Sequence, residues 1–151
     1  NVVGYTNESK QFKEEIMNIL PKSNEVYCTA IESELWKYFS NFLLTGKVIM
    51  ANLLYDICER DWISYDVLKS IAWLDPRIWK SHLDINMDWG RWAGGHCFVK
   101  DLSALHEYYN KSNIIDMYWH ALLEAMEVYN YKTLKKTWKS LPIINQVYWN
   151  D

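Results

Sequence analysis

The stretch Asp84-Ile85-Asn86-Met87-Asp88-Trp89-Gly90-Arg91-Trp92-Ala93-Gly94-Gly95-His96-Cys97-Phe98 lies just past the middle of the chain. Asp88 is a favourable N-cap, so the pattern predicts a helix over about 88–109. Such a helix would contain Gly90, Gly94 and Gly95, and each interior glycine costs roughly 0.5–1 kcal/mol relative to alanine. Close approach of another backbone is the usual reason for accepting that cost.

One face of this predicted helix combines a charge, two small residues and an aromatic ring. Arg91, Gly94, Gly95 and Phe98 are spaced i, i+3, i+4 and i+7, so they share that face. A foreign amphipathic helix with apolar anchors and one carboxylate would fit there. Alternatively, the glycines accommodate a neighbouring helix of the same chain in an ordinary core. The spacing alone leaves both interpretations open.

Two short motifs resemble the Bcl-2 family. Asp88-Trp89-Gly90-Arg91 is similar to the Asn-Trp-Gly-Arg motif of Bcl-2 homology region one, with Asp88 in place of the usual Asn. Residues 54–61, Leu-Tyr-Asp-Ile-Cys-Glu-Arg-Asp, resemble a segment of poxvirus Bcl-2-like apoptosis inhibitors. Trp138 lies near the expected start of homology region two, but the Gly-Gly-Trp of that region is absent.

The resemblance implies an all-α Bcl-2-like bundle of about eight helices around a central buried helix. It implies an anti-apoptotic, viral protein that binds BH-3 helices of Bax, Bak and Bim-like proteins and blocks mitochondrial permeabilisation. Arg91 would pair with the Asp of the bound helix. The expected groove residues are Ile49, Leu53, Leu54, Ile57, Ile78, His82, Leu83, Asp88, Trp89, Gly90, Arg91, Gly94, Gly95 and Phe98. The alternative is a poxvirus Bcl-2-like modulator of innate immune signalling that has no working groove.

Composition agrees with one globular domain spanning residues 1–151. Half of the residues are hydrophobic, and the net charge of −3 argues against nucleic acid as a main partner. Three widely spaced cysteines, Cys28, Cys58 and Cys97, indicate reduced, buried thiols rather than a disulfide framework. The chain starts at Asn1 without Met, and we expect that a hydrophobic C-terminal anchor has been removed. The expected location is the mitochondrial outer membrane or cytoplasm of a host cell.

Hydrophobic periodicity and helix-breaking residues predict helices throughout, with no strand-like alternation. Residues 1–7 are expected to be frayed, and Thr45-Gly46 is expected to end a helix. The predicted helices cover residues 8–20, 25–44, 47–60, 64–74, 76–83, 88–109 and 113–131, followed by two short ones at about 133–140 and 142–149.

Neither a metal site nor an enzyme is expected from the sequence. His82, His96, Cys97 and His106 lie near one another but make no close helical ligand pair. The sequence contains no Gly-x-Gly-x-x-Gly, phosphate loop or nucleophile elbow. We therefore predict a binding protein without a cofactor.

Overall fold

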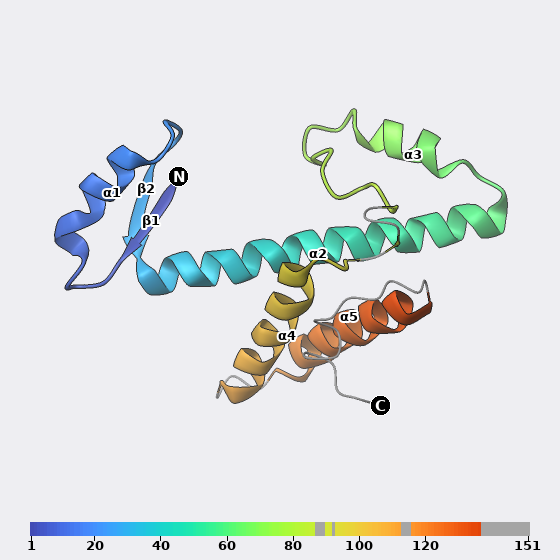
Figure 1. Ribbon diagram of the computed structural model, residues 1–151. Helices are drawn as coiled ribbons and strands as arrows, with labels where there is room; N and C mark the ends of the chain where they lie inside the picture. Colours follow the sequence, from blue (N-terminus) through green and yellow to red (C-terminus); the bar gives the residue numbers. More distant parts are fainter. Residues whose placement is uncertain (87–89, 92, 113–115, 137–151) are drawn as a thin grey trace. The chain divides into compact units, whose positions relative to one another are not determined.

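The computed structural model describes residues 1–86, 90–91, 93–112 and 116–136. Contacts divide the chain into two compact units, residues 1–40 and 41–151. Each unit is described by itself below, and Figure 1 labels its elements.

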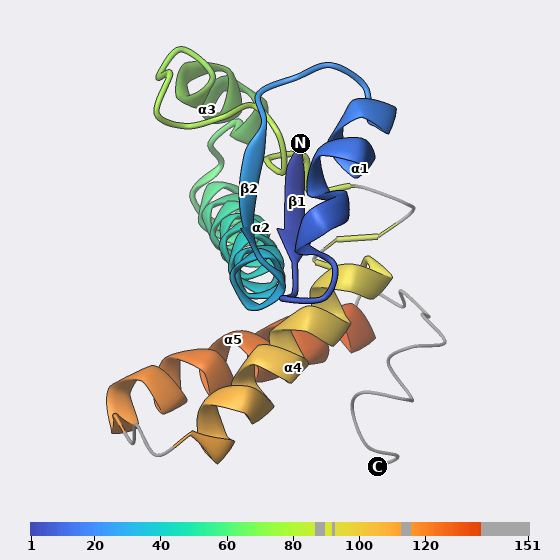
Figure 2. The ribbon, with the colours of Figure 1, turned by 90° about the vertical axis from the view of Figure 1, so that its left-hand side faces the viewer.

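The first unit begins with a β–α–β segment. Strand β1 (Val2–Tyr5) leads through the 3-10 helix η1 (Lys10–Phe12) into α1 (Lys13–Ile19), and strand β2 (Val26–Thr29) follows. The two strands are parallel, with Val2 opposite Val26 and Tyr5 opposite Thr29. Figure 2 shows α1 beside the strand pair, and the ammonium group of Lys13 lies 5.5 Å from the Tyr5 ring centroid and 5.2 Å from that of Tyr27. The connecting helix explains how strands so close in sequence can run parallel.

Gly4 allows β1 to lie against the start of helix α2 (Ala30–Asp61). A Cβ atom at this position would stand 2.6 Å from the Ser33 Cβ atom and 3.1 Å from the Ala30 Cα atom. Both distances are shorter than normal van der Waals contacts. Any side chain at residue 4 would therefore force the strand and helix apart.

Helix α2 (Ala30–Asp61) begins with a capping box. The Thr29 backbone N–H donates to the Glu32 carboxylate at 2.7 Å, and the Glu32 N–H donates to the Thr29 hydroxyl at 3.3 Å. Our prediction that Thr45-Gly46 ends a helix is wrong, because α2 continues through both residues. Thr45 donates its hydroxyl to the Asn41 carbonyl at 2.7 Å, and buried Gly46 makes room for Met126 of a later helix.

The second unit contains most of α2 together with α3 (Tyr65–Ala72), α4 (His96–Lys111) and α5 (Met117–Lys136). Helices α4 and α5 pack against each other, as Figure 1 shows. One core cluster joins Ala51 and Cys58 of α2 to Tyr65 and Ile85. Val99, Leu102, Leu123 and Leu134 are also buried. No helix among the described residues has the length and apolarity needed to cross a membrane.

The prediction of an all-α, eight-helix Bcl-2 bundle is wrong. The described residues form five α-helices, one 3-10 helix and a two-stranded parallel sheet, so the fold is mixed α/β. Residues 1–7 contain β1 rather than a frayed start, and residues 26–29 form β2 rather than the first turn of a helix. Short strands leave little alternation to detect, which explains why periodicity missed them.

Two further helix predictions also differ from the structure. The predicted central helix 88–109 begins only at His96, with Gly95 as its N-cap residue. Gly90 and Gly94 therefore precede the helix and carry no penalty as interior residues. Residues 76–83 form turns rather than a helix. The short helix predicted at 142–149 and most of the one at 133–140 lie outside the described residues.

Candidate functional site

The segment just before α4 is fixed to α2 through Arg91. Its guanidinium donates to the Asn52 side-chain oxygen at 2.9 Å, to the Asn52 carbonyl at 3.2 Å and to Asp56 at 2.6 Å. The same group lies 4.5 Å from the centroid of the Tyr55 ring. Within the chain, the Arg91 guanidinium thus pairs its charge with Asp56 and its planar face with the Tyr55 ring. Its predicted carboxylate partner is in α2 rather than in a bound helix.

The same segment is fixed to α5 through Asn130, whose side chain is fully buried. The Ala93 N–H donates to the Asn130 side-chain oxygen at 3.2 Å, and the Asn130 amide donates to the Ala93 carbonyl at 3.0 Å. One side chain therefore satisfies both polar groups of a buried backbone unit. Together, Asn130 and Arg91 fix the path of the chain into the first turn of α4.

That first turn carries an exposed thiol. Among the three cysteines, Cys97 is exposed, Cys28 is partly buried and Cys58 is buried, so the prediction of buried thiols holds only for Cys58. Cys97 is the second residue of α4, and its side chain is exposed. An accessible thiol is a candidate nucleophile.

Asp101 lies one turn further along α4, at i+4 from Cys97, so the two share a helix face. Its side chain is fully buried. The Asn41 amide of α2 donates to one carboxylate oxygen at 2.5 Å, and the Lys100 ammonium lies 3.3 Å from the other. A buried carboxylate held in this way fixes α4 against α2 one turn after Cys97.

A second pair of polar groups lies near the start of α4. Lys47 of α2 donates to the Trp79 carbonyl, and burial lowers the pKa of Lys47. Burial and, secondarily, the charge of Lys47 lower the pKa of His82. The His82 ring lies 5.5 Å from the Phe98 ring, centroid to centroid, at an interplanar angle of 49°. The 79–82 turn, α2 and the first turn of α4 therefore approach one another around Cys97's neighbour Phe98.

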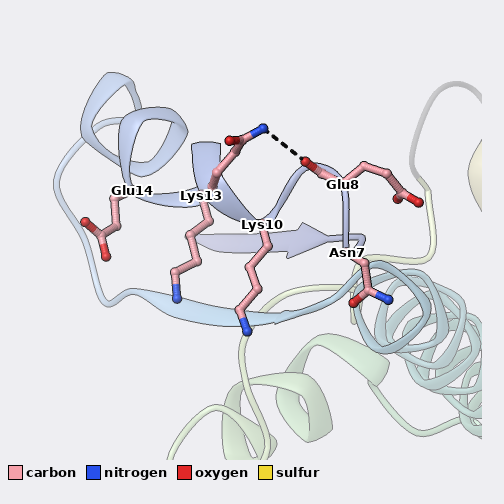
Figure 3. Close-up of a pocket in the computed structure, with 6 residues that line it drawn as sticks. Asn7, Glu8, Lys10, Lys13 and Glu14 are labelled. Carbon is pink, nitrogen blue, oxygen red and sulfur yellow. Dashed lines mark hydrogen bonds between the residues drawn. The ribbon is translucent and has the colours of Figure 1, made fainter.

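Two cavities lie elsewhere in the described chain. One, of about 550 Å³, is an open depression over η1 and the start of α1, where Lys10 and Lys13 extend beside Glu8 and Glu14 (Figure 3). The other, of about 460 Å³, lies between the end of α2, α3 and residues 84–86. There Lys69 neutralises Asp66 at 3.1 Å and Asp84 at 2.8 Å. The first cavity is lined by charged and polar side chains, and the second combines these paired charges with aromatic and apolar residues, Tyr55, Ile63, Tyr65 and Ile85.

The residues expected in a groove differ in their burial and contacts. His82 contacts Phe98, and Leu83 packs against the Ala51–Ile85 core cluster. Ile49 is half-buried, Gly90 and Arg91 are partly buried, Gly94 is buried and Gly95 is exposed. Asp88 and Trp89 lie outside the described residues. The apolar side chains left exposed are Leu53, Leu54, Ile57 and Ile78.

Sequence reasoning missed Asn41, Asp101 and Asn130, and it treated Cys97 as a buried thiol. The i, i+4 spacing of Cys97 and Asp101 was the one available signal, because it places a nucleophile and an acid on one helix face. Asn41 and Asn130 contact the site across 60 and 37 residues of sequence, which no local pattern encodes.

Comparison with known proteins identifies the family. The model of the UDP-glucose/GDP-mannose dehydrogenase family, central domain, matches residues 31–132, which is more than half of the chain. The chain belongs to this family. The match covers nearly all of α2, the whole of α3 and α4 and most of α5, and it includes every residue placed around the start of α4 above.

Three relatives illustrate the similarity. The chain is 40% identical over 75 residues to the UDP-glucose 6-dehydrogenase AglM of Haloferax volcanii, covering 49% of this chain and 16% of the relative. It is 33% identical over 128 residues to the UDP-glucose 6-dehydrogenase of Rickettsia bellii, covering 83% and 28%. The corresponding enzyme of Rickettsia conorii is 32% identical over 114 residues, covering 75% and 26%. The chain thus spans less than a third of each relative, and no solved structure gives a significant match.

The family match overturns the Bcl-2 interpretation. The prediction of an anti-apoptotic viral protein is wrong, and so is the prediction that BH-3 helices are its partners. The prediction that it is not an enzyme is also wrong at the level of the family, whose named members are dehydrogenases. A four-residue motif rich in Trp and Gly gave the misleading resemblance. In the structure, Gly90 and Arg91 of that motif precede a helix rather than opening one.

Proposed function

We propose that this chain is the central part of a nucleotide-sugar dehydrogenase that oxidises UDP-glucose at C6, with Cys97 as its nucleophile. The family and the printed activity of the relatives support the reaction class. The observation that carries the residue assignment is the exposed thiol in the first turn of α4, one turn from a buried carboxylate.

The chemistry at C6 explains why a thiol is useful. Loss of a hydride from C6, to an acceptor such as the nicotinamide dinucleotide that the family implies, and of the hydroxyl proton would convert the primary alcohol into an aldehyde. A thiolate is a strong nucleophile toward an aldehyde carbon. The Cys97 sulfur forms a bond to that carbon while the C=O π electrons move to oxygen, which takes a proton from solvent. The product is a hemithioacetal. It keeps the sugar covalently attached instead of releasing a reactive aldehyde.

The surrounding residues hold the thiol in position. Asn130 and Arg91 fix the segment that leads into α4, and the Asp101–Asn41 hydrogen bond fixes α4 against α2. These contacts join α4 and the segment before it to α2 and α5, and they fix the position of the helix turn that carries Cys97. A misplacement of about 1 Å at a reacting atom can lower a rate by roughly 10²-fold.

The β1-to-α1 connection does not fit the pyrophosphate of the nicotinamide dinucleotide that the family implies as the hydride acceptor. The β1-to-α1 connection, Thr6-Asn7-Glu8-Ser9, contains no glycine for close approach of a pyrophosphate. The first turn of α1 also carries the acidic side chains of Glu14 and Glu15, which would repel a phosphate.

Alkylation with and without UDP-glucose tests this proposal. We expect iodoacetamide to modify Cys97 faster than Cys28, and UDP-glucose to slow modification of Cys97 alone, as read by peptide mass spectrometry. Cys28 lies in the first unit and is the internal control. Equal protection of both thiols, or protection of neither at saturating UDP-glucose, would contradict the proposal.

A further inference from the structure

His82 carries two unfavourable features at one position. Its φ angle is 65°, in the left-handed region that residues other than glycine seldom occupy. Its Nδ1 atom is buried and has no hydrogen-bond partner among the described residues. Backbone strain and unsatisfied buried atoms each cost free energy, and they are concentrated at functional sites. Their coincidence at His82 therefore indicates a role for this residue beyond folding.

The contacts of His82 lead to the thiol. Its ring centroid lies 5.5 Å from that of the Phe98 ring, at an interplanar angle of 49°. Phe98 directly follows Cys97 in the first turn of α4, so a movement of Phe98 also moves the backbone that carries the sulfur. The segment before His82 is held to α2, because the Lys47 ammonium donates to the Trp79 carbonyl. His82 thus lies between a fixed segment and the turn that carries the thiol.

The surroundings of His82 favour its uncharged form. Burial lowers the pKa of His82, and the positive charge of Lys47 on α2 lowers it further. Asp84, the nearest carboxylate along the same segment, is paired with Lys69 of α3 at 2.8 Å. A proton on His82 would therefore add a positive charge to a partly buried place beside Lys47. We expect the charged ring to turn toward water, which breaks its contact with Phe98.

We propose that His82 is a positioning residue for Cys97. Its uncharged ring holds Phe98, and with it the first turn of α4, and a proton on the ring releases that turn. The inference rests on the proposed role of Cys97 as a nucleophile, and it gives His82 no contact with the substrate. Cys97 then reacts as a correctly placed thiol only while His82 is uncharged.

The pH profile of Cys97 alkylation tests this inference in the full chain, without UDP-glucose. On α4, the titratable or charged neighbours of Phe98 are His96, Cys97 and Lys100, so every chain compared also carries His96→Gln to remove the imidazole beside the thiol. Iodoacetamide modification is read by peptide mass spectrometry. For a thiol that acts alone, the rate falls about tenfold per pH unit below the thiol pKa. In the parent chain it should fall more steeply below about pH 6.5, because His82 also takes up a proton there.

Three variants separate positioning from a general effect of pH. His82→Asn removes the ring and its proton, while Asn tolerates a positive φ. Its rate should fall only about tenfold per pH unit, and at neutral pH it should be about threefold or more below the parent rate. His82→Phe keeps an aromatic ring without a proton, and it serves if His82→Asn does not fold by circular dichroism. It should show the same shallower profile. His120→Gln removes an imidazole on α5 and should keep the steep parent profile.

Two results would overturn the inference. One is the same profile in the parent and in a folded His82 variant. The other is a parent profile shallower than that of the variant, because a cation that only stabilises the thiolate raises the rate when His82 takes up its proton. The proposed function is tested separately, since its measurement is the protection of Cys97 by UDP-glucose.

Discussion

Replacement of Asn130 by alanine should destabilise the second unit through the backbone of Ala93. The Asn130 side chain is 0% exposed and satisfies both the N–H and the carbonyl of Ala93, at 3.2 and 3.0 Å. Alanine leaves these two backbone groups without their partner, and an unsatisfied buried group costs about 1–3 kcal/mol. We therefore expect a loss of about 2–5 kcal/mol in the free energy of unfolding.

Urea unfolding followed by circular dichroism measures this loss. Lys132→Ala, an exposed change two residues further along α5, is the matched control and should stay within about 0.5 kcal/mol of the parent. Under native conditions, the freed segment should also change the alkylation rate of Cys97, four residues after Ala93. A loss below 1 kcal/mol for Asn130→Ala, with an unchanged alkylation rate, would refute the reasoning that Asn130 fixes the path into α4.

Three other predictions follow from single positions. Gly4→Ala should destabilise the first unit by about 1–3 kcal/mol because its Cβ would lie 2.6 Å from Ser33, whereas Gly95→Ala, with nothing within 4 Å, should be within about 0.5 kcal/mol of the parent in thermal unfolding. Burial and the charge of Lys47 lower the folded-state pKa of His82, so the unfolded chain takes up the proton first as the pH falls and the parent loses stability just below pH 6.5. His82→Gln should remove this loss from a plot of the free energy of unfolding against pH. Arg91→Lys keeps the charge but loses the forked contacts to Asn52 and Asp56, and should cost about 1–3 kcal/mol in urea unfolding; an unchanged midpoint would show that the positive charge alone suffices.

Local signals predicted the helices whose ends are set by nearby residues. The helix expected over 64–74 is α3, Tyr65–Ala72, and the one expected over 113–131 overlaps α5, Met117–Lys136. The signal failed where distant packing decides. Gly46 predicts a helix end. In the structure it is buried against Met126, 80 residues later, and α2 continues through it.

The candidate site was predictable only in part. Arg91, His82 and Phe98 were singled out from the sequence, and the structure places all three close to the start of α4. Their roles differ from expectation because their partners are distant in sequence. Asp56 lies 35 residues before Arg91, and Asn41 lies 60 residues before Asp101. Because those distant contacts cannot be seen in the sequence, a short motif resembling another family led to the wrong family prediction.

The most direct test of the central claim replaces the equivalent segment of the Rickettsia bellii relative, which matches this chain over 128 residues, with residues 31–132 of this chain. After circular dichroism has shown that the hybrid folds, nicotinamide-linked oxidation of UDP-glucose is measured for the hybrid and for its Cys97→Ser variant. We predict that the hybrid oxidises UDP-glucose and that Cys97→Ser abolishes complete turnover. A folded hybrid without UDP-glucose oxidation, or one in which Cys97→Ser is equally active, would contradict the account.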